Sequence, residues 1–330
     1  MKIVAPISRV EEIAPLAAAG ADEFYCGLVP EDWTRRFGSS GANRRIFGNL
    51  QTYEQLGTAV RCAHERACRL SLVMNAQHYD ERRTQALLEL AHRFAAFGGD
   101  ALVVGDIGLL RLLATAGPRV RLHVSSLLTC RNSEAAAMYA EFGASRIVLP
   151  RDVTLAEIAE MATSCRQVEF EAFILNDGCV FEEGSCHTIH LPGALGGPIC
   201  LDRYTQDVTR VDGQPLSADG RIEFERHGAR YQEWLWHRFG QGFAPTGDGY
   251  PAGPCGICAM PRLAASGVAA VKIAGREAPM VRKIKSVELV GIVRERIRAG
   301  EDAEQVRQFA MGLRAGTTVC ERSLGCYYAT

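Results

Sequence analysis

Eight short apolar runs alternate with amphipathic helical patterns along this chain of 330 residues. The runs are rich in Val, Ile, Leu and Phe, which is typical of strands buried on both faces. Helices between successive strands demand parallel pairing, because a parallel connection has to cross over the sheet. Eight such units favour an α/β fold of the closed (β/α)8 type, with an open doubly wound sheet as the alternative. The predicted strands are residues 2–7, 23–28, 70–75, 101–106, 121–126, 146–151, 168–174 and 269–274.

The regular spacing fails once, between the seventh and eighth predicted strands. Roughly 90 residues lie there, far more than the usual connection of a few residues. We therefore expect one barrel domain over residues 1–330 with an insertion over residues 176–268. The middle of the insertion, residues 210–243, mixes turn signals with aromatic residues and predicts an ordered lid or hairpin.

The composition of the chain indicates its cellular compartment and the kinds of partner it could bind. A net charge of −1 and a pI near 6.7 give no overall attraction to nucleic acid, so RNA is an unlikely partner on this ground alone. No apolar run approaches the roughly 18 residues of a membrane span, and the first residues do not form a signal-peptide core, so we expect a cytoplasmic protein. Twelve cysteines in a reducing compartment point to metal or redox work where they cluster.

Active sites of (β/α)8 barrels form at the carboxyl ends of the strands. Several cations fall at these ends, and a pocket where Arg151, Lys272 and Arg276 converge suits a small ligand with carboxylates. From this position we expect Asn75, Asp106, His123 and Asn176 in catalytic roles and Arg151, Lys272, Arg276 and Ser125 in substrate binding; Cys26, Ser126 and Glu171 share the position.

Cysteines mark both ends of the insertion. Cys179, Cys186 and Cys200 open it, and Cys255 and Cys258 close it. Zinc ribbons use two C-x-x-C pairs, whereas only one pair is present here, so the wide spacing favours a four-cysteine iron–sulfur site. Zinc with His187 or His190 as a further ligand is an alternative, and free buried thiols are another. A nucleophile elbow G-x-S-x-G and an H-E-x-x-H helix are both missing from the sequence, so no motif indicates hydrolysis.

Successive blocks of the chain resemble the U32 peptidase family. They include "GADEFYCGL", "LSLVMNAQHY", "GGDALVVGDIGLLRLL", "LHVSSLLTCRNSEAAAMYAEFGASRIVLPRDVTLAEI", the cysteine loop and "GVAAVKIAGREAP", from near residue 3 to about residue 300. The resemblance implies a [4Fe–4S] cluster on four cysteines and oxygen-independent hydroxylation, with prephenate as the oxygen donor. It implies Cys179, Cys186, Cys200 and Cys258 as the cluster ligands, and it leaves Cys255, Cys320 and Cys326 without a role.

Two positions depart from the family pattern. Asn176 stands where relatives carry histidine, and Ala274 replaces an acidic residue. Because the chain also lacks the C-terminal extensions of the RNA-modifying members, we expect a small organic acceptor that is hydroxylated with prephenate or a similar carboxylate. A peptidase is one alternative function, and a cluster-bearing partner of a paralogous hydroxylase is another. A paralogue or a second copy of the chain is the expected protein partner.

Overall fold

A computed structural model of the chain describes residues 1–37, 42–45, 47–76, 79–179, 182–186, 200, 206–239, 245–314 and 320–328. Eight parallel strands form a closed barrel in sequence order, and β8 pairs with β1, so the predicted (β/α)8 fold is confirmed. The strands are β1 (Lys2–Pro6), β2 (Glu23–Cys26), β3 (Arg69–Met74), β4 (Ala101–Val104), β5 (Arg121–Val124), β6 (Ala144–Val148), β7 (Glu169–Leu175) and β8 (Ala270–Ile273).

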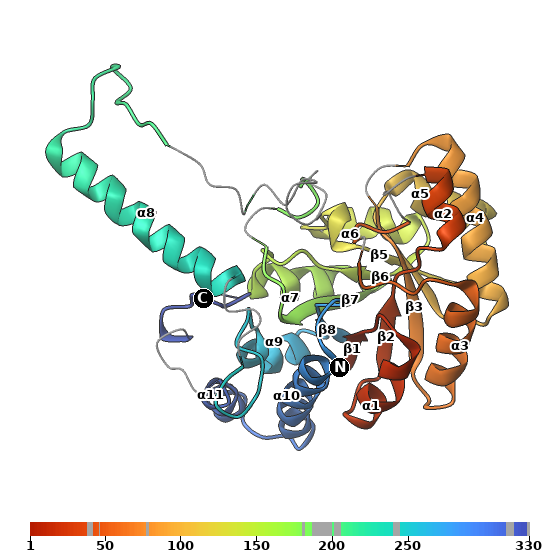
Figure 1. Cartoon of the computed structure of the whole chain (residues 1–330). Coiled ribbons are helices and arrows are strands. Elements are labelled where there is room, and N and C mark those ends of the chain that lie inside the picture. The colour runs from red at the N-terminus through yellow and green to blue at the C-terminus, as the bar shows by residue number, and fades with distance from the viewer. Residues whose placement is uncertain are drawn as a thin grey trace.

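Helices surround the barrel (Figure 1). Several begin at a side-chain cap: Thr52, Asp80 and Asn132 each accept a hydrogen bond from a backbone N–H of the first turn. The helices are α1 (Ile13–Ala18), α2 (Glu31–Phe37), α3 (Tyr53–His64), α4 (Glu81–Ala96), α5 (Ile107–Ala116), α6 (Ser133–Glu141), α7 (Leu155–Ser164), α8 (Ala218–Phe239), α9 (Met260–Ala265), α10 (Met280–Arg298) and α11 (Ala303–Gly312), with 3-10 turns η1 (Val10–Glu12), η2 (Ser126–Leu128) and η6 (Ile257–Ala259). Among the described helices, none has the length and apolar character to cross a membrane.

The segment between β7 and β8 differs from the expected lid or hairpin. Its turn signals form a tight turn, where Thr209 and Pro215 face each other in an antiparallel bridge. The aromatic part is instead the 22-residue helix α8, which extends away from the barrel (Figure 1). Glu223 pairs with Arg226 and His227 at helical spacing, and such pairs favour a helix over a hairpin.

The barrel interior holds a buried ion network below its open end. Arg146 on β6 has no exposed surface, and its guanidinium donates to both carboxylate oxygens of Glu23 on β2, at 2.6 and 3.1 Å. The same guanidinium lies 3.1 Å from Glu171 on β7, and Lys272 on β8 donates to Glu171 at 2.7 Å. Four strands are therefore tied together by charge-assisted hydrogen bonds around one arginine.

The electrostatics of this network keep its carboxylate ionised. Burial alone raises the pKa of Glu23, but the hydrogen bonds and charge of Arg146 outweigh burial and hold that pKa at about 2. The neighbouring His123 on β5 is 2% exposed, and burial together with the charge of Arg146 lowers its pKa well below the usual value. The interior thus contains matched charges and a neutral imidazole.

Removing the central cation should leave two buried carboxylates, Glu23 and Glu171, with one lysine each and without the guanidinium that joins them. We predict that Arg146→Ala lowers the free energy of unfolding by roughly 3–5 kcal/mol, measured by urea denaturation. Arg298→Ala, which removes a half-exposed helical pair with Glu295, is the matched control and should cost less than about 1 kcal/mol. Equal costs for the two variants would contradict the central place of Arg146.

Candidate functional site

A cavity of about 400 Å³ opens at the carboxyl ends of the strands. Its floor is apolar and comes from the strands themselves, with Val73, Val103 and Val148 among the residues lining it. Polar and charged side chains line it as well, from strand ends and from the loops that follow them. This is the position at which barrels of this type bind their ligands.

Two predicted residues, Asn75 and Ser125, meet in this cavity. The Asn75 side chain donates from Nδ2 to Ser125 Oγ at 3.2 Å, and its Oδ1 accepts from the backbone N–H of Arg44 at 3.3 Å. Asn75 follows β3 and Ser125 follows β5, so the two side chains meet across the open end of β4. Both side chains therefore lie at strand ends and line the same cavity.

Asn176 follows β7 and also lines the cavity, but its side chain is hydrogen-bonded to other residues of the protein. Its φ of 68° is in the left-handed region, which asparagine tolerates better than most residues. Its Nδ2 donates to Ser286 Oγ at 3.0 Å, and its Oδ1 accepts from Arg282 at 3.2 Å. The side chain that replaces the family's histidine therefore holds the loop after β7 against α10.

Arg276 is held at the cavity by neutral groups. Its two terminal nitrogens donate to Asn49 Oδ1 and Asn43 Oδ1, each at 2.8 Å, and the side chain is 8% exposed. Amide oxygens orient a guanidinium without cancelling its charge. Gly27 makes room for this arrangement, because a Cβ there would lie 2.0 Å from Asn49 Oδ1 and 2.1 Å from Arg276 Nη1.

The other two predicted cations have acidic partners. Arg151 forms an ion pair with Glu183 and lies over the ring of Phe173, with 3.7 Å between the guanidinium carbon and the ring centroid. Lys272 pairs with Glu171 and lies 4.0 Å from the centroid of the Tyr25 ring. Both reach the cavity, so Arg151, Lys272 and Arg276 converge as predicted.

The structure adds charged residues that strand-end reasoning did not find. Arg44 and Arg45 come from the long loop after β2, where the paired basic residues of "GANRRIFGN" were the available signal. Arg45 pairs with Asp177 at 2.7 Å, which ties this loop to the loop after β7. Among the residues that the structure describes, seven Lys and Arg side chains and three Asp and Glu side chains line the cavity, so it attracts anions.

Asp106 and His123 are not among the residues that line this cavity. The Asp106 carboxylate caps α5 by accepting a hydrogen bond from the backbone N–H of Leu109 at 2.7 Å. His123 precedes Ser125 by two positions on β5, so it faces the same interior one layer deeper, beside the charge of Arg146. The geometry gives neither residue access to a ligand in the cavity.

Cys179, Cys186 and Cys200 line the cavity together. Burial raises the pKa of the Cys200 thiol, and the nearby sulfurs of Cys179 and Cys186 raise it further, while Arg44 opposes the shift. Three thiols that would repel one another as thiolates suit a cationic metal centre. Within the described residues, no group of three His, Cys, Asp or Glu side chains is close enough to hold a single ion. Thiolates ligate both zinc and iron–sulfur centres, so the three cysteines are a suitable donor set for either kind of metal centre.

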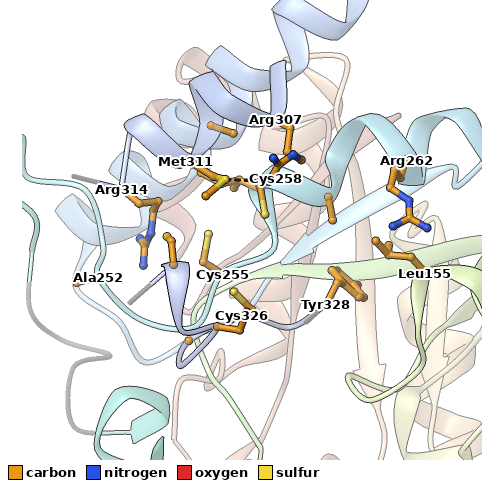
Figure 2. A pocket seen from close by; sticks show the side chains of 16 residues that line it. Leu155, Ala252, Cys255, Cys258, Arg262, Arg307, Met311, Arg314, Cys326 and Tyr328 are labelled. Atoms are coloured by element: carbon orange, nitrogen blue, oxygen red, sulfur yellow. Dashed lines mark hydrogen bonds between the residues drawn. The ribbon is translucent and has the colours of Figure 1, made fainter. Parts of the chain in front are cut away.

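Cys258 lies apart from these three cysteines. It lines a second cavity with Cys255, Cys320 and Cys326 (Figure 2). Of the four ligands that the family resemblance implies, three therefore line the cavity at the mouth of the barrel and Cys258 lines the second cavity. His187 and His190, the ligands considered for zinc, fall outside the described residues.

Comparison with known proteins gives three informative relatives. The "Uncharacterized protease MJ0090" of Methanocaldococcus jannaschii is 28% identical over 195 residues, which is 56% of this chain and 44% of the relative. The "tRNA hydroxylation protein P" of Escherichia coli is 23% identical over 56% of this chain and 38% of the relative. The "23S rRNA 5-hydroxycytidine C2501 synthase" of Escherichia coli is 27% identical over 52% of this chain and 24% of the relative. The chain spans less than half the length of each.

The matched region of the family covers β2 to β8 and all the described cysteines of the two cavities except Cys326. The sequence model described as "Peptidase family U32" matches residues 8–322, from the first strand's end to the C-terminal cysteine segment. This match spans nearly the whole chain and includes the cavity residues described above. The chain therefore belongs to peptidase family U32.

Proposed function

We propose that this protein is an oxygen-independent hydroxylase that holds a [4Fe–4S] cluster and takes its oxygen from prephenate or a similar carboxylate. One observation carries the proposal: three cysteines and a set of convergent arginines open onto the same cavity. A bound cluster would supply a redox-active, Lewis-acidic iron. Relatives named as tRNA and rRNA hydroxylation proteins support the reaction class.

The cysteines and the arginines would have different roles within the cavity. Cys179, Cys186 and Cys200 would hold the cluster, and a set of three leaves one iron of a four-iron cluster without a cysteine. Arg276, oriented by Asn43 and Asn49, would bind a donor carboxylate with a charge that no acidic hydrogen-bond partner among the described residues offsets. The remaining side chains then act on what these two groups position.

Ionic and polar contacts give the other predicted residues their roles. Arg151 would offer a second carboxylate contact, at the cost of sharing its charge with Glu183. The Asn75 amide and the Ser125 hydroxyl form a polar pair that can hydrogen-bond an uncharged group of the ligand. The valine floor excludes water from the buried end of the cavity, which strengthens every charge interaction above it.

The hydroxylated acceptor is a small organic molecule in this proposal. Near-neutral net charge gives no general attraction to a polyanion. RNA is the second candidate acceptor, because the printed names of two relatives specify tRNA and rRNA. Assays with small aromatic acceptors and with total RNA from an undermodified strain distinguish the two, by mass spectrometry of the product.

Loss of a barrel-mouth thiolate should remove the cluster. We predict that Cys179→Ala, purified without oxygen, loses most of its iron, acid-labile sulfide and hydroxylation activity, while Cys62→Ala on α3 keeps all three. Iron analysis and an absorbance spectrum check this. Full iron content in Cys179→Ala would contradict the assignment, and peptide cleavage by the iron-free protein would favour a peptidase.

Loss of the Arg276 contact should weaken donor binding without removing the cluster. We predict that Arg276→Met raises the Kd of prephenate about 10- to 100-fold, as expected when a hydrogen-bonded ion pair is lost. Gly27→Ala should shift the same way, because its Cβ displaces Asn49 and Arg276. Titration calorimetry measures both.

The matched control is Arg298→Met on the outer helix α10, which should leave the Kd of prephenate unchanged. Iron content should equal that of the unmodified protein in all three variants. An Arg276→Met protein that binds prephenate as tightly as the control would contradict the assigned role.

A further inference from the structure

Four cysteines that the proposed function does not use line a second cavity of about 270 Å³ (Figure 2). Cys255 and Cys258 come from the segment that leads into α9, and Cys320 and Cys326 come from the C-terminal segment. The side chains labelled Cys255, Cys258 and Cys326 in Figure 2 point into the same space. All four cysteines are free thiols in the structure.

Backbone hydrogen bonds bring the two segments together. The Cys255 N–H donates to Gly325 O at 2.9 Å, and the Tyr327 N–H donates to Cys255 O at 3.0 Å. Cys255 and Cys326 therefore face each other in a parallel bridge, although 71 positions separate them in sequence. The ladder fixes both thiols beside the cavity, so their proximity is built into the fold.

The same segments are anchored to the barrel. The Gly256 N–H donates to Ile174 O, and the Tyr328 hydroxyl donates to Phe173 O, each at 2.8 Å. Gly256 allows this packing, because a Cβ there would lie 2.9 Å from the Tyr328 ring. The cysteines thus sit on a scaffold that β7 positions.

Charge around the cavity suits an anionic centre. Arg307 and Arg314 line the cavity together with the four cysteines. Metal binding would displace the thiol protons, and the two arginines would offset the negative charge of a thiolate centre.

Two kinds of metal centre could be bound by four thiols at this position. Four cysteines in the pattern C-x2-C and C-x5-C can hold either zinc or an iron–sulfur cluster. Zinc requires sulfurs about 3.8 Å apart, given a Zn–S bond of about 2.3 Å and tetrahedral geometry. A cavity of about 270 Å³ lined by all four cysteines has room for a centre of several metal atoms, so the cluster is the occupant to test.

We propose that Cys255, Cys258, Cys320 and Cys326 bind a second iron–sulfur cluster, separate from the cysteines at the barrel mouth. The loop after β7 lies between this site and the cavity at the barrel mouth. Tyr327, next to Cys326, donates its hydroxyl to Asn176 O and Asp177 O, and Arg238 of the barrel-mouth cavity donates to Cys326 O at 2.8 Å. Loading of this site would therefore stabilise the loop that carries Cys179.

Metal content of variants tests the proposal without any assay of hydroxylation. The protein is reconstituted without oxygen from ferrous iron and sulfide, and iron, acid-labile sulfide and zinc are counted per chain. Cys255→Ser/Cys320→Ser should lose about two to four iron atoms with matching sulfide, while Cys179→Ser/Cys186→Ser should keep that share. Cys62→Ser/Cys165→Ser, which changes two cysteines outside both cavities, should keep all the iron.

Full iron retention in Cys255→Ser/Cys320→Ser would overturn the proposal, since it is the result for a single cluster with Cys258 as its fourth ligand. One zinc ion per chain bound by this cysteine set would also overturn it. Alkylation of the unmodified protein by iodoacetamide gives a readout that needs no variant. Mass spectrometry should find Cys255 and Cys320 protected until a chelator and an oxidant remove the iron, and labelling at equal rates before and after removal would contradict the site.

Discussion

The guanidinium of Arg146, enclosed in the barrel with no exposed surface, holds the structure's interior together. It joins carboxylates from β2 and β7, and through Glu171 it fixes Lys272 on β8. A buried charge of this kind is tolerated only when its partners are complete. Lys272 also lies against the ring of Tyr25, and both side chains line the cavity, so the ion network borders the cavity.

Above that network, the cavity gathers cations from segments that are remote in sequence. Arg276 follows β8, Arg151 follows β6, and Arg45 belongs to the loop after β2. Asp177 and Glu183, which pair with Arg45 and Arg151, come from the loop after β7, and the same loop carries the first cysteines. The cysteines and the arginines that could bind carboxylates therefore line one cavity. For this reason a metal centre and an anionic ligand are assigned to one site.

Much of the fold followed from the sequence, because eight buried parallel strands leave a periodic apolar signal. The strand-end rule also found Asn75, Ser125, Arg151, Lys272 and Arg276, since barrel strands all end at one rim. It failed for Asp106, because an aspartate after a strand can equally cap the next helix, as its bond to Leu109 shows. His123 lies two positions before Ser125 on β5 and therefore deeper in the barrel than the cavity. A strand end predicted from sequence is not accurate enough to distinguish these two positions.

Loop residues were harder to place, because no periodicity marks them. Arg44 and Arg45 reach the cavity only through the path of the loop after β2. The family resemblance grouped Cys258 with Cys179, whereas Cys258 lines a second cavity with Cys255 and Cys326, which a backbone bridge joins. Pairing of segments so far apart depends on the tertiary fold and leaves no local signal.

The central claim is that a cluster on the barrel-mouth cysteines and a carboxylate on Arg276 occupy one cavity. Electron paramagnetic resonance of the reduced, anaerobic protein tests it directly, with prephenate added to the unmodified chain and to Arg276→Met. Prephenate should change the cluster spectrum of the unmodified chain, and the variant should need a higher concentration for the same change. A spectrum that saturating prephenate leaves unchanged in the unmodified chain would contradict the shared site.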